Sequence, residues 1–175
     1  MEPIKKNNPI LASIAAWAKE KSDMIEFAYN TTGGWEGWAQ VELAARLYKD
    51  HGYKYGPNQQ SKIVREVPIY TSSNRSAADI AIYKNGDPAQ GALIFELKCE
   101  SYKSTDRFKK NVLLDWEKVT GGLKPEFRSA DIWVIGLAIS NDANQAMETM
   151  DPDFDEYQYD SGPVTIWWKQ TEVRR

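Results

Sequence analysis

The stretch that decides the fold is Ala92-Leu93-Ile94-Phe95-Glu96-Leu97-Lys98-Cys99. It is apolar apart from Glu96 and Lys98, and a short run of this kind is typical of a buried strand. Side chains alternate along a strand, so Ile94, Glu96 and Lys98 share one face. Burying a charged pair is costly unless the pair is partnered or bound to a metal. The stretch therefore predicts a buried strand with a functional site on one face.

The preceding segment, residues 77–83, alternates like a second strand, and an Asn-Gly-Asp-Pro turn separates the two. Pairing of these strands would bring Asp79 close to Glu96 and Lys98. Two carboxylates and the carbonyl of Leu97 are hard oxygen ligands that suit Mg²⁺ or Mn²⁺. A lysine beside them can orient or deprotonate a water and neutralise charge on a phosphate. This set indicates phosphodiester hydrolysis; the alternative is an ordinary ion pair between Glu96 and Lys98 on an edge strand.

The sequence on either side of this pair of strands predicts one α/β (α+β) domain over residues 1–175. Apolar residues at helical spacing predict helices over 8–29, 35–48 and 104–120, with a short helix over 144–150. Alternating or continuous apolar runs predict strands over 62–70, 77–83, 92–99, 131–140 and 163–169.

This order and the acids within it resemble the PD-(D/E)xK nuclease superfamily, which has the restriction-endonuclease-like fold. The resemblance covers about residues 33–140, with the helix 8–29 and the strand 163–169 as additions. It implies an αβββαβ core: a mixed central sheet flanked by helices. The motif falls on Asp79 and on Glu96-Leu97-Lys98, while Ala78 stands where the name of the motif has proline.

The resemblance also implies roles for these residues. Asp79, Glu96 and the carbonyl of Leu97 would hold Mg²⁺ or Mn²⁺, and Lys98 would act on the attacking water. Many members add a glutamate from the preceding helix, and we expect Glu42 in this role, as a further catalytic and metal-binding residue.

Glu42 is preferred because it lies beside an expected apolar stripe of Trp38, Val41, Ala45 and Tyr48, where a solvated glutamate would be unexpected. Glu36 competes with it, although the helix dipole already explains an acid near a helix N-terminus. Glu66 is a weaker candidate for binding a second metal or a water.

Four basic residues are candidates for substrate binding. Lys103, Arg107 and Lys110 follow the motif at helical spacing and would hold phosphates. Arg75 lies in a Ser/Asn-rich loop before Asp79 and could track the same backbone. A solvated helix face and a flexible turn explain these residues equally well.

The composition excludes several other classes of protein. The net charge is 22 − 25 = −3, but residues 142–160 hold seven acids and no Lys or Arg, which leaves the remainder at 22 − 18 = +4. We interpret this acidic stretch as a solvated loop. The single cysteine, Cys99, rules out an internal disulfide and a cysteine-rich zinc site. No apolar run is long enough for a membrane span or a secretion signal, so a cytoplasmic protein without a membrane partner is expected.

Two hypotheses about function follow. The first is a metal-dependent nuclease, more an endonuclease than an exonuclease, that acts on DNA or, as the alternative, on RNA such as tRNA. Small domains of this resemblance include toxins, defence nucleases and mobile-element nucleases, so an inhibitor or immunity protein is a candidate partner. The second hypothesis is a catalytically inactive protein of the same fold that binds proteins or nucleic acids, with its acidic stretch as one candidate surface.

Overall fold

The computed structural model describes residues 8–31, 34–51, 62–71, 77–157 and 160–171. The helices in these ranges are α1 (Pro9–Glu20), α2 (Ser22–Tyr29), α3 (Glu36–His51), α4 (Thr105–Thr120) and α5 (Asn141–Glu148). The strands are β1 (Lys62–Val67), β2 (Ala78–Tyr83), β3 (Ala92–Cys99), β4 (Asp131–Ala138), β5 (Asp155–Glu156) and β6 (Thr165–Gln170).

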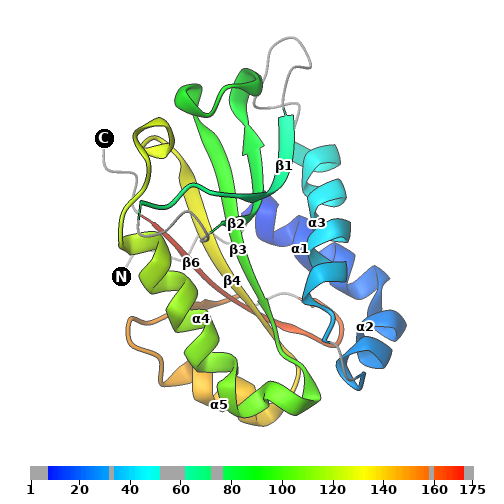
Figure 1. Cartoon of the computed structure of the whole chain (residues 1–175). Helices are drawn as coiled ribbons and strands as arrows, with labels where there is room; N and C mark the ends of the chain where they lie inside the picture. The colour runs from blue at the N-terminus through cyan, green and yellow to red at the C-terminus, as the bar shows by residue number, and fades with distance from the viewer. Residues whose placement is uncertain (1–7, 32–33, 52–61, 72–76, 158–159, 172–175) are drawn as a thin grey trace.

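The strands form one mixed sheet in the order β1-β2-β3-β4-β6-β5 (Figure 1). Strands β3 and β4 are parallel, and the other neighbouring strands are antiparallel. The α/β class is therefore confirmed, and the elements from α3 to β4 follow in the predicted order of helix, three strands, helix and strand. None of the helices in the described ranges has the length and apolar character needed to cross a bilayer.

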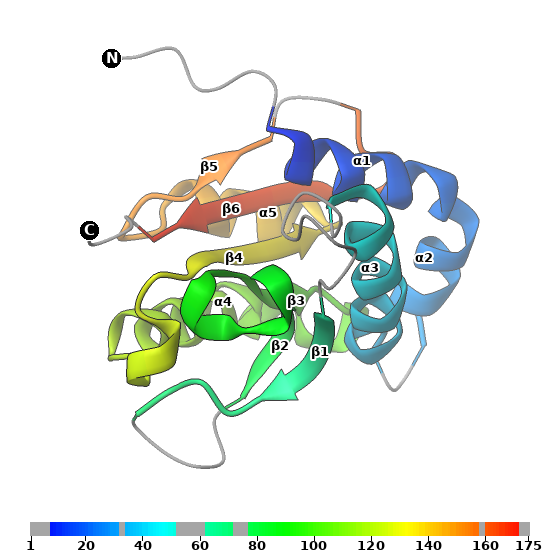
Figure 2. The same ribbon diagram turned by 90° about the horizontal axis from the view of Figure 1, so that it is seen from above.

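Helices cover both faces of the sheet (Figure 2). The core on one face joins α1, α2 and α3 to residues such as Ile80 and Phe95, and the core on the other joins α4 and α5 to residues such as Ile94. Gly136 in β4 lets α4 approach closely, because a Cβ there would lie 3.1 Å from Phe108 Cζ and 3.2 Å from Val112 Cγ2. This approach fixes α4 beside β3 and β4.

Three expectations about the elements need correction. The N-terminal helix is two helices, because the backbone leaves the helical region at Lys21, where φ is −100° and ψ is 15°. The first strand ends at Val67 and does not reach residue 70. The acidic stretch 142–160 is not one solvated loop, since it contains most of α5, capped by Ser140, and the short strand β5.

Candidate active site

The site forms where β2 leaves β3. Pairing of the two strands runs from Tyr83 opposite Ala92 to Ile80 opposite Phe95 and stops there, one position before Asp79 would face Glu96. On its other side β3 stays paired with β4 as far as Cys99. From Glu96 onward, β3 therefore has one edge that β2 does not cover.

Two carboxylates take the place of β2 along this edge. Asp79 Oδ2 accepts a hydrogen bond from the backbone N–H of Leu97 at 2.7 Å, and Glu36 Oε2 accepts one from the N–H of Cys99 at 3.3 Å. The N–H and C=O of one strand residue point to the same edge, so the carbonyl of Leu97 faces the side on which Asp79 lies. Asp79 and the Leu97 carbonyl are thus on the same edge of β3.

Glu96 projects to the α4 side of the sheet, and its side chain is completely buried. It accepts hydrogen bonds from the hydroxyl of Tyr70 and, at 2.6 Å, from Lys118 Nζ. Burial raises the pKa of Glu96 to about 8, although the charge of Lys118 opposes the shift. Lys118 Nζ also lies 3.2 Å from Asp115 Oδ1, 3.4 Å from the carbonyl of Ala77 and 5.2 Å from the centre of the Tyr70 ring.

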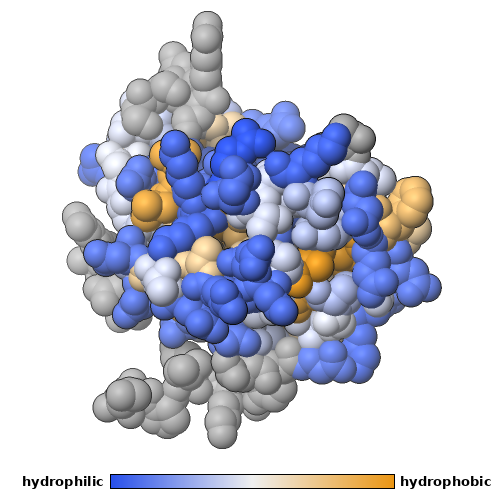
Figure 3. Space-filling view, turned by 90° about the horizontal axis from the view of Figure 1, so that it is seen from below, coloured by the Kyte–Doolittle hydropathy of each residue, from blue (hydrophilic) through white to orange (hydrophobic). Residues whose placement is uncertain are grey.

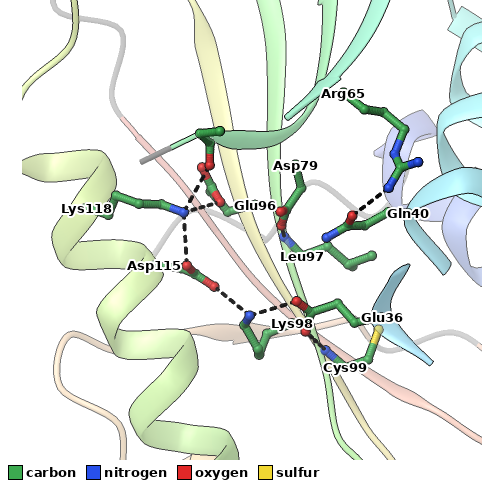
Figure 4. Close-up of polar contacts among 11 residues, drawn as sticks. Glu36, Gln40, Arg65, Asp79, Glu96, Leu97, Lys98, Cys99, Asp115 and Lys118 are labelled. Carbon is green, nitrogen blue, oxygen red and sulfur yellow. Dashed lines mark hydrogen bonds and ion pairs between the residues drawn. The ribbon is translucent and has the colours of Figure 1, made fainter. Parts of the chain in front are cut away.

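Lys98 extends the line of charges from α4 to α3 (Figure 4). Its Nζ lies 2.9 Å from Glu36 Oε1 and 3.6 Å from Asp115 Oδ2. Burial alone would lower the pKa of the Lys98 ammonium, but Asp115 and Glu36 raise it overall. Alternating charges therefore run from Glu96 through Lys118, Asp115 and Lys98 to Glu36.

Negative charge exceeds positive charge in this cluster. Four carboxylates, from Glu36, Asp79, Glu96 and Asp115, stand against the two ammonium groups of Lys98 and Lys118. The pKa of Asp79 is raised to about 6, mainly by burial and also by Asp115, while the N–H of Leu97 opposes the shift. The donors are hard oxygen atoms with surplus negative charge, which is the chemical type of ligand that Mg²⁺ or Mn²⁺ prefers. Within the described ranges, no three His, Cys, Asp or Glu side chains come close enough together to hold a metal ion.

The expectation for Glu42 is not supported by its position. Glu42 pairs with Lys21 at 3.3 Å and is about one-third exposed (34%), whereas Glu36 reaches Lys98. The expected apolar stripe is displaced from the real one: Val41 is 52% exposed, and the buried side of α3 carries residues such as Leu43. The rotation of the helix therefore turns Glu42 away from β3.

Two residues of the cluster, and one neighbour of it, were missed in the sequence. Asp115 and Lys118 border the apolar stripe of α4, between Val112 and Val119. This position beside buried residues was the one signal in the sequence that could have indicated their place in the cluster. Gln40, one turn after Glu36, is buried and accepts a hydrogen bond from Arg65 at 2.9 Å.

Glu66, a weaker candidate from the sequence, lies next to the cluster in the sheet. The register of β1 and β2 places it opposite Asp79, because Arg65 faces Ile80 and Val67 faces Ala78. Its backbone has a φ of 54°, a left-handed conformation within the strand. Glu66 is therefore next to Asp79 in register, but it does not belong to the line of alternating charges that runs from Glu96 to Glu36.

The predicted substrate-binding residues lie on the surface. Lys103, Arg107 and Lys110 are all exposed, and Arg107 Nε lies 3.9 Å from Asp106 Oδ1. Arg75 lies outside the described residues. Comparison of the chain with family models, with curated proteins and with solved structures gives no match.

Proposed function

We propose that this protein is a metal-dependent nuclease with a restriction-endonuclease-like core that extends from α3 to β4. The observation that carries the proposal is the geometry at the β3 edge: Asp79 and Glu96 stand where pairing with β2 ends, and Lys98 follows two residues after Glu96 on the same face. A buried cluster of acids and lysines is costly to maintain, and clusters of perturbed pKa values are typical of functional sites.

The arrangement of the elements supports the resemblance. Strands β1, β2 and β3 form an antiparallel meander, and α4 then leads to β4, which is parallel to β3. Helix α3 packs on the other face and brings Glu36 to Lys98. These features support an αβββαβ core of the kind that the resemblance implies.

Each residue has a distinct role in the proposed reaction. Asp79, Glu96 and the Leu97 carbonyl would hold Mg²⁺, which supplies positive charge that activates water and offsets charge on the phosphate. Lys98 orients the attacking water and stabilises the negative charge that develops on the phosphate. Glu36 keeps Lys98 in place and keeps it protonated, because the two groups are in contact.

The test is cleavage of closed circular plasmid, linear DNA and tRNA in the presence of Mg²⁺, Mn²⁺ or EDTA. Cleavage that requires the metal supports the proposal, and cleavage of the closed circle identifies an endonuclease. Asp79→Asn and Glu96→Gln should abolish cleavage, whereas Asp23→Asn, at an exposed position on α2, should not.

Both site variants should fold, and thermal unfolding without metal should show equal or greater stability. The reason is that burial and neighbouring acids already penalise the charged forms of Asp79 and Glu96. Folded protein that leaves all three substrates intact would contradict the nuclease and favour the inactive, interaction-only alternative.

A further inference from the structure

Lys118 places a cation on the carboxylate that the proposed function assigns to the metal. Its ammonium is surrounded by three oxygens: Glu96 Oε2 at 2.6 Å, Asp115 Oδ1 at 3.2 Å and the carbonyl of Ala77 at 3.4 Å. The ring of Tyr70 covers a further side of the ammonium. Oxygen ligands of this kind are those that a hard divalent cation prefers.

The contact with Lys118 also offsets the negative charge of Glu96. Glu96 is completely buried, and its other described partner is the hydroxyl of Tyr70, which carries no charge. Lys118 is therefore the group that offsets the charge of Glu96. A divalent ion that binds Glu96 must share this carboxylate with Lys118 or displace it, and two cations on one carboxylate repel each other.

We propose that Lys118 is a built-in competitor of the divalent metal: it pairs with Glu96 until the metal binds, and it is then displaced. This inference rests on the proposed function, because it takes Glu96 as a metal ligand. Lys118 is suited to the role because its ammonium is carried by a flexible chain of four carbons. The ammonium can therefore move away from Glu96 while α4 stays in place.

The inference fixes the direction in which a substitution changes metal affinity. Lys118→Met keeps the apolar stem but removes the competing charge, so it should tighten Mn²⁺ binding. A hydrogen bond to a charged group corresponds to roughly 10–100-fold in an equilibrium constant, and we expect an increase of this order. If Lys118 only held Glu96 in position, the same substitution would weaken binding.

The experiment is calorimetric titration of Mn²⁺ into the wild type and the variant, repeated at several pH values in the same buffers so that the two proteins are compared at equal pH. Lys109→Met is the matched control, since Lys109 is on the same helix but donates to Thr149. Tighter binding by Lys118→Met alone supports the inference. Equal or weaker binding overturns it but leaves the nuclease proposal standing, whereas no Mn²⁺ binding by any of the three proteins overturns both.

A second measurement needs no substitution and so does not depend on the folding of a variant. In wild-type protein with ¹⁵N-labelled lysine, Mg²⁺ should change the NMR signal of the Lys118 ammonium and leave that of Lys109 unchanged. A Lys118 signal that stays constant while calorimetry shows Mg²⁺ binding would overturn the inference.

Discussion

Glu36 and Glu42 lie on one helix, six residues apart, and the structure gives them different partners. Glu36 contacts Lys98, and Glu42 contacts Lys21. We expect Glu36→Gln to lower kcat/KM for plasmid cleavage by about 10–100-fold, the usual cost of losing a group that orients a catalytic residue. Glu42→Gln should cleave at the wild-type rate.

The pH profile separates positioning by Glu36 from a general loss of structure. Glu36 helps to raise the pKa of the Lys98 ammonium, so in Glu36→Gln this pKa falls. The decline in activity at alkaline pH should therefore begin at a lower pH than in the wild type. Equal losses in the two variants, or an alkaline limb that does not move, would contradict the role given to Glu36.

The cluster residues that the sequence predicts are those that break a local pattern. Glu96 and Lys98 interrupt an apolar run, and Asp79 interrupts the strand before it. The sequence favours Glu42 over Glu36 only when the apolar stripe of the helix is assigned to the wrong positions, and on a helix one position is a rotation of about 100°. Lys118 carries no comparable signal, because its contact with Glu96 depends on how α4 packs on the sheet.

At the scale of elements, Glu100 ties the end of β3 to its surroundings. Its side chain is completely buried and accepts hydrogen bonds from the N–H groups of Ile139 and Ser140 at 2.6 and 2.8 Å. Hydroxyl groups of Ser140 and Thr105 donate at 2.6 Å each, and that of Tyr29 at 3.3 Å. One carboxylate thus joins β3, α2, the start of α4 and the segment between β4 and α5.

We expect Glu100→Gln to lower the free energy of unfolding by about 1–3 kcal/mol, because the amide turns a donor toward groups that are themselves donors. Burial alone would raise the pKa of Glu100, but the bonds from Ser140, Thr105 and the backbone lower it overall. A lowered pKa means that the stabilisation is full above the ordinary value of 4.5 and is lost as the pH falls through the lower, folded value.

Urea unfolding at neutral pH and well below pH 4.5 tests this dependence. The difference between wild type and Glu100→Gln should be large at neutral pH and shrink in acid. Glu117→Gln, at an exposed position of α4, is the control and should change little at either pH. A difference that is the same at both pH values would show that the charge of Glu100 does not contribute.

Element type was more predictable than element boundaries. The apolar period of α4 and the continuous apolar run of β4 are strong signals, and both elements were found. The break at Lys21 carries no Gly or Pro, so the helical pattern runs through it. Strand β5 has two exposed acidic residues and exists only because β6 pairs with it.

At the scale of the molecule, charge is distributed unevenly across the sheet. The acidic strand β5 forms one edge, three strand positions from β3, which is about 14 Å at the usual strand spacing. Because that distance exceeds the screening length of about 8 Å at physiological salt, dissolved ions largely screen the charge of β5 at the position of β3. The end of the molecule seen in Figure 3 is mostly hydrophilic, and hydrophobic side chains appear there only at separate places.

The basic residues of α4 lie on the side of the sheet that carries the charge cluster. Arg107 and Lys118 are eleven residues apart, which is about three helical turns, so they lie along the same side of α4. Arg107 and Lys110, with Lys103 just before the helix, are exposed. A nucleic acid backbone that runs along α4 to the edge of β3 would pass these three side chains.

We expect the combined replacement of Lys103, Arg107 and Lys110 by Gln to weaken binding equally for all sequences, because bonds to phosphate carry no sequence information. On duplex DNA it should flatten the dependence of log K on log[salt] by up to about 2.7, since each phosphate that is no longer neutralised lowers the slope by ~0.9. The measurement is a binding titration at several salt concentrations, on an Asp79→Asn background that does not cleave.

The control removes the same charge from the opposite face of the sheet. Lys19, Lys21 and Lys49 belong to α1, its C-terminal end and α3, and their replacement by Gln lowers the net charge by the same three units. Net charge alone would make the two triple variants equivalent, whereas direct binding of phosphates would change the salt slope only in the α4 variant. A slope that changes equally in both, or in neither, would mean that the backbone of the substrate does not run along α4.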